Sequence, residues 1–151
     1  MEIFDLKNKQ EYLNEVMDLE FIEWSNCKLE EKNEKIKSKI QKYYDYVNDN
    51  YFCKLILVDK DELIGFISIF PYDCEEEKEL TPWYSTMYVK EKYRKKGYSK
   101  ILNSAILKEA EKRNIKILYL KTNLNNYYEK FGAKLVKILK TGEKIMKFEI
   151  E

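Results

Sequence analysis

The apolar residues of this chain change their spacing near residue 50, and this change limits the folds that the chain can adopt. Residues 9–24 and 28–47 carry apolar side chains at helical intervals, and Glu20 interrupts the first of these stripes. Residues 52–58 and 63–70 are shorter and rich in β-favouring side chains, and a short turn separates them. Side chains on one face recur about every 3.6 residues in a helix and every 2 in a strand. The pattern therefore predicts two helices followed by a β-hairpin.

The second half of the chain predicts further strands around one long helix, which Gly97 opens. The strand expected at 115–121 is continuous and apolar, as is typical of a strand buried on both faces. The other strands are expected at 3–6, 82–89, 133–139 and 143–149, and a short helix at 125–131 ends at Gly132. The long helix should bury Ile101, Leu102, Ala105, Ile106 and Ala110. The order β-α-α-β-β-β-α-β-α-β-β indicates one domain over residues 1–151, of class α/β (α+β), with a mixed sheet and helices on both faces.

The charges of the chain nearly balance, with 28 Lys+Arg against 27 Asp+Glu and a net charge of +1. A nucleic-acid-binding protein usually carries a strong basic field, so we expect no nucleic-acid partner. Charged residues make up 36% of the chain, and the longest apolar runs have the length of a strand. We therefore expect no membrane span.

Cysteine and histidine limit the chemistry that the chain can perform. Cys27, Cys53 and Cys74 are odd in number and match no metal-binding spacing, so we expect no metal and reduced thiols in a cytoplasmic protein. The first residues show no secretory signal pattern. The chain contains no histidine, which excludes Ser-His-Asp and Cys-His catalysis. Proton transfer must use Tyr, Cys, Lys, a carboxylate or water.

The segment at 87–102 carries the strongest functional signal. A strand ends near Val89, and a helix begins near Gly97. The first turn of a helix has unpaired N–H groups and a partial positive charge, so it binds anions. Basic residues add to this charge at Arg94, Lys95, Lys96 and Lys100. The natural ligand of such a turn is a pyrophosphate, whereas the plainer alternative is a loop with solvated lysines.

Three motifs in this half of the chain resemble the GNAT superfamily of N-acetyltransferases. Residues 94–99 fit the Arg/Gln-x-x-Gly-x-Gly/Ala signature of that family, except that Ser99 replaces the final Gly or Ala. Residues 125–133 are similar to the Phe-Tyr-Glu-Lys-Leu-Gly-Phe block, with Tyr128 at the tyrosine of the family. Leu-Thr-Pro-Trp at 80–83 resembles one subgroup. The resemblance is clear over residues 57–132.

The resemblance implies a fold, a cosubstrate and a set of binding residues. The fold would be a GNAT-like mixed, mostly antiparallel sheet of six to seven strands flanked by about four helices. Acetyl-CoA would be the cosubstrate, without a metal. The central strands would splay, and the amide edge at 87–89 would pair with pantetheine. Backbone N–H groups of the turn would hold the pyrophosphate, and an asparagine would bind the pantetheine arm. The implied residues are Met87, Tyr88, Val89, Arg94, Lys95, Lys96, Gly97, Tyr98, Ser99 and either Asn123 or Asn125.

The resemblance also implies the reaction, which is direct attack of an amine on the thioester in a ternary complex. Tyr128 is the candidate general acid for the leaving thiolate, although it could instead be a packing tyrosine. The general base is less well defined, because Trp83 occupies the position where many relatives carry a glutamate. Glu79 could act through a water that Ser85 and Thr86 position, or solvent could accept the proton without any single base.

The acceptor is expected to be a small amine or a peptide amine. The acidic loop at 73–79 could attract a cationic amine or could simply be solvated, and the aromatic residues near the sheet could line a pocket or belong to the core. A catalytically silent acyl-CoA-binding module is the alternative function, motivated by Trp83. A nucleic-acid-binding domain that uses residues 90–100 is a third reading, which the balanced charge disfavours. The closing hairpin could pair with a second copy in a homodimer.

Overall fold

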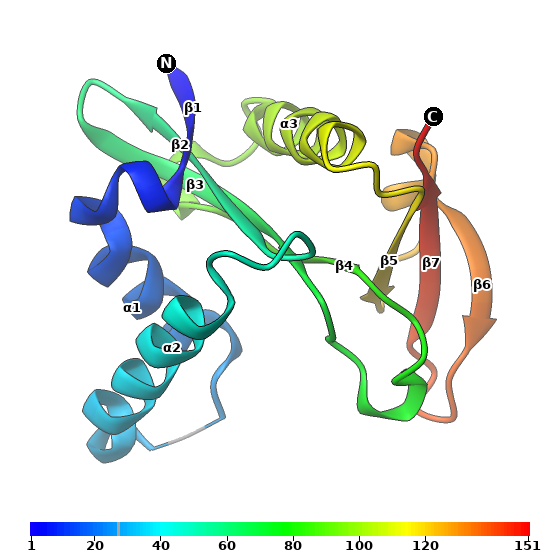
Figure 1. The fold of residues 1–151 in the computed structure, drawn as a ribbon, viewed down its shortest axis with the longest axis horizontal. Coiled ribbons are helices and arrows are strands. Elements are labelled where there is room, and N and C mark those ends of the chain that lie inside the picture. Colours follow the sequence, from blue (N-terminus) through cyan, green and yellow to red (C-terminus); the bar gives the residue numbers. More distant parts are fainter. Residues whose placement is uncertain (27) are drawn as a thin grey trace.

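The computed structural model describes residues 1–26 and 28–151, and its centre is a sheet of seven strands (Figure 1). The strands are β1 (Glu2–Asp5), β2 (Cys53–Asp59), β3 (Glu62–Phe70), β4 (Trp83–Val89), β5 (Ile117–Thr122), β6 (Lys134–Ile138) and β7 (Lys144–Glu149). Their spatial order is β1-β2-β3-β4-β5-β7-β6, and each neighbouring pair is antiparallel except the parallel pair β4–β5.

Helices cover both faces of this sheet. The α-helices of the described residues are α1 (Leu13–Trp24), α2 (Lys32–Tyr46) and α3 (Tyr98–Lys112), and Figure 1 shows α1 and α2 on one side of the β1–β4 half with α3 on the other. Val16 of α1 and Tyr43 of α2 pack with Phe66 of β3 in one core cluster. The predicted fold class, a mixed and mostly antiparallel sheet between helices, is therefore confirmed.

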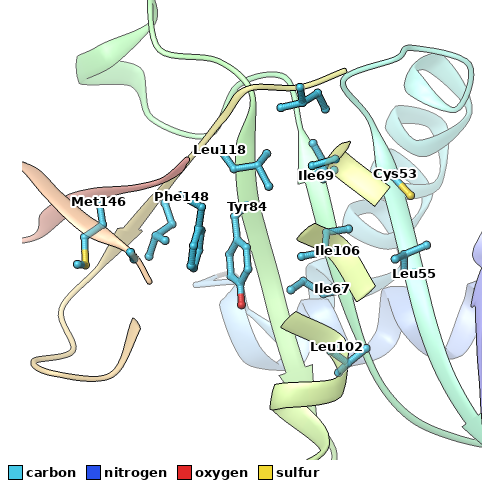
Figure 2. Close-up of a cluster of buried hydrophobic side chains, with 14 of the residues drawn as sticks. Cys53, Leu55, Ile67, Ile69, Tyr84, Leu102, Ile106, Leu118, Met146 and Phe148 are labelled. Atoms are coloured by element: carbon cyan, nitrogen blue, oxygen red, sulfur yellow. The ribbon is translucent and has the colours of Figure 1, made fainter. Parts of the chain in front are cut away.

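The second core cluster lies beneath α3. Figure 2 shows Leu102 and Ile106 of this helix facing Ile67 of β3, with Leu118 of β5 in the same cluster. Leu102, Ile106, Ile67 and Leu118 are all fully buried. Burying each of them stabilises the fold by about 1.5–3 kcal/mol, so this cluster ties α3 firmly to both halves of the sheet.

Three local expectations are wrong in detail. Ile101 is 40% exposed, because its side chain lies off the narrow face of α3 that carries Leu102 and Ile106. The strand β5 is buried on one face only, since Leu118 and Leu120 are buried while Tyr119 between them is half-buried. The short helix expected at 125–131 is a 3₁₀ turn at Tyr128–Phe131, which Gly132 ends with a φ of +98°.

The strands β4 and β5 separate soon after they meet. A single residue pair, Trp83 with Tyr119, joins them. On its other side β4 pairs with β3, but the register shifts between Phe66 and Ser68, so that β4 contains one extra residue there. Thr86 lies in this β-bulge with a φ of +50°. The rest of the β4 edge that faces β5 therefore has no strand partner among the described residues.

Gly65 of β3 allows β4 and α3 to approach this region closely. A Cβ atom at this position would overlap the carbonyl oxygen of Tyr88 and would lie 3.1 Å from Cα of Val89 and 3.2 Å from Cδ1 of Leu102. Only glycine fits such a contact without displacement of the backbone.

Cys53 and Cys74 are free and buried, and Cys27 lies outside the described residues. No described helix is long and apolar enough to span a membrane. In the same part of the chain, no group of acidic, Cys or His side chains could hold a metal ion.

Candidate active site

Two cavities lie where β4 and β5 separate. The turn cavity, about 400 Å³, lies against the strand-to-helix turn, and the central cavity, about 690 Å³, lies against α1, α2, β4 and β5. Glu23, Met87 and Tyr128 line both. A molecule bound in the turn cavity would therefore reach a molecule in the central cavity at these three side chains.

The turn cavity is built on the backbone conformation of residues 94–99. Gly97 is the N-cap of α3 and has a φ of +83°, while Lys95 has a φ of +64°. A Cβ at Gly97 would meet nothing within 4 Å, so glycine is needed here for its backbone angle rather than for space. Behind the turn, Arg94 Nε donates to the Val89 carbonyl oxygen at 2.8 Å, and its guanidinium lies 5.5 Å from the Tyr88 ring centroid. These contacts fasten the turn to the end of β4.

The cavities include most of the predicted binding residues and leave out two. Lys96 lines neither cavity. Asn123 lines the central cavity, whereas Asn125 is exposed and accepts a hydrogen bond from Lys144. The predicted residues that line the turn cavity are Met87, Tyr88, Val89, Arg94, Lys95, Gly97, Tyr98 and Ser99.

Tyr128 stands at the junction of the two cavities. Its ring packs edge to face against Tyr84 at 5.7 Å and against Tyr127 at 4.8 Å between centroids. Burial, followed by the nearby Tyr127, raises the pKa of Tyr128 to about 12. The phenol is therefore protonated at neutral pH and can donate a hydrogen bond into the junction. Tyr84 has its own partner, since its hydroxyl donates to Asn103 Oδ1 at 2.7 Å.

The carboxylates of the acidic loop lie in different surroundings. Glu79 is exposed, lines neither cavity and lies close enough to Glu77 and Lys137 to affect their pKa values. Asp73 instead lines the central cavity, where Ser85 Oγ donates to Asp73 Oδ2 at 3.4 Å. Desolvation by the surrounding protein atoms raises the pKa of the Asp73 carboxyl above its usual range, although the residue as a whole is exposed and this shift is therefore screened by solvent. The structure thus brings Asp73, and not Glu79, to the cavity that Tyr128 lines.

The position that lacks the expected glutamate is part of the core. Trp83 is fully buried, and its Nε1 donates to the Leu80 carbonyl oxygen at 2.7 Å. The next residue, Tyr84, contributes to the lining of the central cavity, but its side chain is 3% exposed and lies in the core cluster beneath α3. Trp24 also lines that cavity, whereas Tyr43 is buried among core side chains.

Side chains of both charges line the central cavity. The lysines Lys39, Lys42 and Lys121 come from α2 and β5, and the carboxylates are Glu20, Glu23, Asp73 and Glu143. Sequence reasoning did not assign Glu20 or Glu23 to the site. Glu20 could have been noticed, because it is a carboxylate within an apolar helical stripe, whereas Glu23 carries no such signal.

Comparison with known proteins gives one family and several similar structures. The model of the acetyltransferase (GNAT) family matches residues 13–133. No curated protein matches the sequence.

Three solved structures illustrate the likeness in fold. An aminoglycoside 6'-N-acetyltransferase complexed with coenzyme A has a TM-score of 0.74 at 20% identity, and the match covers 100% of this chain and 98% of that one. The Salmonella typhimurium protein yncA with its cofactor acetyl-CoA has a TM-score of 0.72 at 14% identity, with 99% and 94% covered. A ribosomal-protein-alanine N-acetyltransferase from Brucella melitensis has a TM-score of 0.68 at 16% identity, with 99% of each chain covered.

Proposed function

The chain belongs to the acetyltransferase (GNAT) family, and on this premise we propose that residues 1–151 form one N-acetyltransferase domain that transfers an acetyl group from acetyl-CoA to a primary amine by direct attack in a ternary complex. The observation that carries the proposal is the meeting of the two cavities at Glu23, Met87 and Tyr128. One cavity suits the donor, the other suits the acceptor, and a proton-donating phenol lies where they meet.

The turn cavity supports the donor assignment. The N–H groups at the start of α3 and the basic side chains of Arg94 and Lys95 favour a pyrophosphate. The edge of β4 at 87–89 has no strand partner on the side of β5, and apart from the Val89 carbonyl, which accepts from Arg94, its backbone groups there can bind the amides of pantetheine as an added strand would. The acetyl group would then reach the junction. Asn123 remains a candidate contact for the pantetheine arm, and Asn125 is less well placed.

In the proposed reaction, the neutral amine attacks the thioester carbonyl, a C–N bond forms, and the C–S bond breaks to release the CoA thiolate. The Tyr128 phenol donates a hydrogen bond to the departing sulfur. Its pKa of about 12 exceeds that of an ordinary thiol, which is about 8.5. We infer that Tyr128 stabilises the thiolate mainly through this hydrogen bond. The attacking nitrogen loses one proton, which passes to a base and from there to the CoA thiolate, so that free CoA thiol is the second product.

The amine proton needs an acceptor, and we propose that Asp73 takes it through a water held by Ser85. The location of Asp73 in the central cavity supports this role. A raised pKa brings a carboxylate nearer to the strength that a general base needs at neutral pH. Glu79, which the sequence suggested, remains the competing candidate and is tested in parallel.

The lining of the central cavity supports an acceptor that carries an anionic group besides its amine. Lys42 and Lys121 form no ion pair within the described residues, so they can attract a carboxylate. The carboxylates Glu23, Asp73 and Glu143 also form none there, so they can attract an amine. An amino acid or a peptide amine fits this charge pattern better than a polyamine. Aminoglycosides and ribosomal-protein alanine, which occur in the names of similar structures, belong in the acceptor panel.

A catalytically silent acyl-CoA-binding module is the second candidate. It is favoured by one observation, the buried Trp83 at the position where relatives carry a carboxylate. A homodimer through the closing hairpin and a cytoplasmic location also stay predictions.

The test combines binding with turnover. Acetyl-CoA at millimolar concentration should raise the melting temperature of the protein by linkage. Release of free CoA thiol is then measured against amino acids, peptides, polyamines and aminoglycosides. Thiol release that falls sharply in Tyr128→Phe supports the enzyme. Stabilisation without release for any amine supports the silent module, and no stabilisation at all contradicts both.

A further inference from the structure

A line of hydrogen-bonded polar groups crosses the interior from α1 to the β4 bulge. Lys54 Nζ of β2 lies 2.6 Å from Glu20 Oε2 of α1 and donates to Ser68 Oγ of β3 at 2.8 Å. Ser68 Oγ lies 2.6 Å from Thr86 Oγ1 of β4. We call these four residues the buried network. It joins three neighbouring strands and one helix that lines the central cavity.

Stability alone does not account for this network. Lys54 is 2% exposed, Ser68 is fully buried and Glu20 is 4% exposed. Burial lowers the pKa of Lys54, because an ammonium loses its hydration there, and Glu20 only partly offsets the loss. Well-packed apolar residues of similar size would stabilise such a position as well or better. A buried lysine with these partners therefore indicates a requirement for a defined geometry.

The end of the network coincides with a strained point of the backbone. Thr86 has a φ of +50°, in the left-handed region that a β-branched residue rarely adopts. The register shift between β3 and β4 lies at the same place. The hydroxyl contact with Ser68 fixes the Thr86 side chain against β3. It thereby offsets part of the strain of the bulge.

The bulge directs the strand segment that follows it. Met87 comes next in the chain and lines both cavities, and residues 87–89 form the edge proposed to bind pantetheine. We propose that Lys54 and Ser68 are positioning residues, which hold the Thr86 bulge and so set the direction of the donor-binding edge of β4. This inference rests on the proposed function. Ser68 and Lys54 line neither cavity, so they do not contact a ligand bound there, and the hydroxyl contact with Thr86 is the route by which Ser68 reaches the donor-binding edge.

The test uses variants that each lack one hydroxyl group, and it compares them with a control variant of a nearby buried residue. Ser68→Ala and Thr86→Val each break the Ser68–Thr86 contact with little change in shape. Cys53→Ala is the control, since Cys53 is a buried side chain on the strand that carries Lys54 but belongs to the cluster under α3. Ser68→Thr keeps the hydroxyl and should preserve function. Calorimetry gives the Kd for CoA, thiol release gives kcat and KM, and thermal unfolding gives stability.

We expect Ser68→Ala to raise the Kd for CoA by about threefold to tenfold, as for the loss of one hydrogen bond. The value of kcat/KM should fall by about tenfold or more, because the thioester is displaced from the junction. The double variant with Thr86→Val should be no worse than the more affected single variant. Cys53→Ala should lower the melting temperature without changing Kd or kcat.

The inference is overturned if Ser68→Ala affects Kd and kcat no more than Cys53→Ala does. It is also overturned if Ser68→Thr is as impaired as Ser68→Ala, because the hydroxyl would then be irrelevant. A wild-type protein that binds CoA but acetylates no amine refutes the proposed function instead. In that case the Kd for CoA of the same variants still decides the role of the network.

Discussion

Replacing Gly65 by alanine tests how closely the donor-binding edge depends on the packing behind it. The new Cβ would overlap the Tyr88 carbonyl oxygen and crowd Cα of Val89 at 3.1 Å and Cδ1 of Leu102 at 3.2 Å. Two of these three contacts are backbone, so β4 itself must move. Overpacking of this kind costs about 1–3 kcal/mol. Alanine regains about 0.4–1 kcal/mol by restricting the unfolded chain, so a net loss of up to about 2.6 kcal/mol remains.

For a chain of this length, such a loss lowers the melting temperature by up to about 10 °C. The same movement displaces Tyr88 and Val89, which line the turn cavity, so the Kd for CoA should rise by about fivefold or more. Thermal unfolding and calorimetry measure the two effects on one sample.

Gly142→Ala is the matched control for this prediction. Gly142 has a φ of +92°, a Cβ there meets nothing within 4 Å, and the residue lines neither cavity. Alanine at this turn should cost about 1–2 kcal/mol through the backbone alone, with no change in the Kd for CoA. If Gly65→Ala binds CoA as tightly as Gly142→Ala and the wild type do, the close packing behind β4 has no influence on the donor site, and the reasoning fails.

Three further predictions concern the chemistry and the buried pair. Tyr128→Phe should lower kcat by about 100-fold with little change in the Kd for CoA, and thiol release with calorimetry checks both. The pKa of Asp73 is raised and the base acts only when ionised, so activity should rise with pH through a pKa above the ordinary value of about 3.9. Asp73→Asn should abolish this rise of activity with pH. If Glu79→Gln abolishes it instead, Glu79 is the general base. Lys54→Met should lower the free energy of unfolding by up to about 3–5 kcal/mol, and combining it with Glu20→Leu should restore most of this stability in chemical denaturation.

The features that sequence predicted well are local ones. Gly97 and Arg94 lie within a few residues of each other, and the strand, turn and helix that they mark follow from short-range preferences. The change of period near residue 50 likewise predicted the two helices and the hairpin. Each of these signals lies within the element that it predicts or in the turn beside it.

The features that sequence missed depend on contacts between distant segments. Asp73 is one of several acidic residues in its loop, and only the fold decides that it meets Ser85, 12 residues away. In the sequence, Lys54 resembles any lysine on a strand, and only the fold brings Glu20 next to it. The second face of β5 was expected to be buried, but α1 and α2 cover only the β1–β4 half of the sheet, so this face is only half-buried. The candidate base and the buried network are therefore tertiary features, and the sequence signals only Glu20 among them, as a carboxylate within an apolar helical stripe.

These tertiary features converge on one short segment of β4. Gly65 limits its position from β3, Thr86 bends it, and the loss of pairing after Trp83 frees its outer edge. A donor that binds this edge depends on all three features. The first sets the position of the strand, the second its direction, and the third leaves its backbone groups available. The acceptor side depends on them less, since its charged groups come mainly from α1, α2 and β5. Donor affinity and acceptor preference should therefore respond to separate sets of substitutions. Thiol release measured at saturating acetyl-CoA no longer depends on donor affinity, so it reports the effect of substitutions on the acceptor side alone.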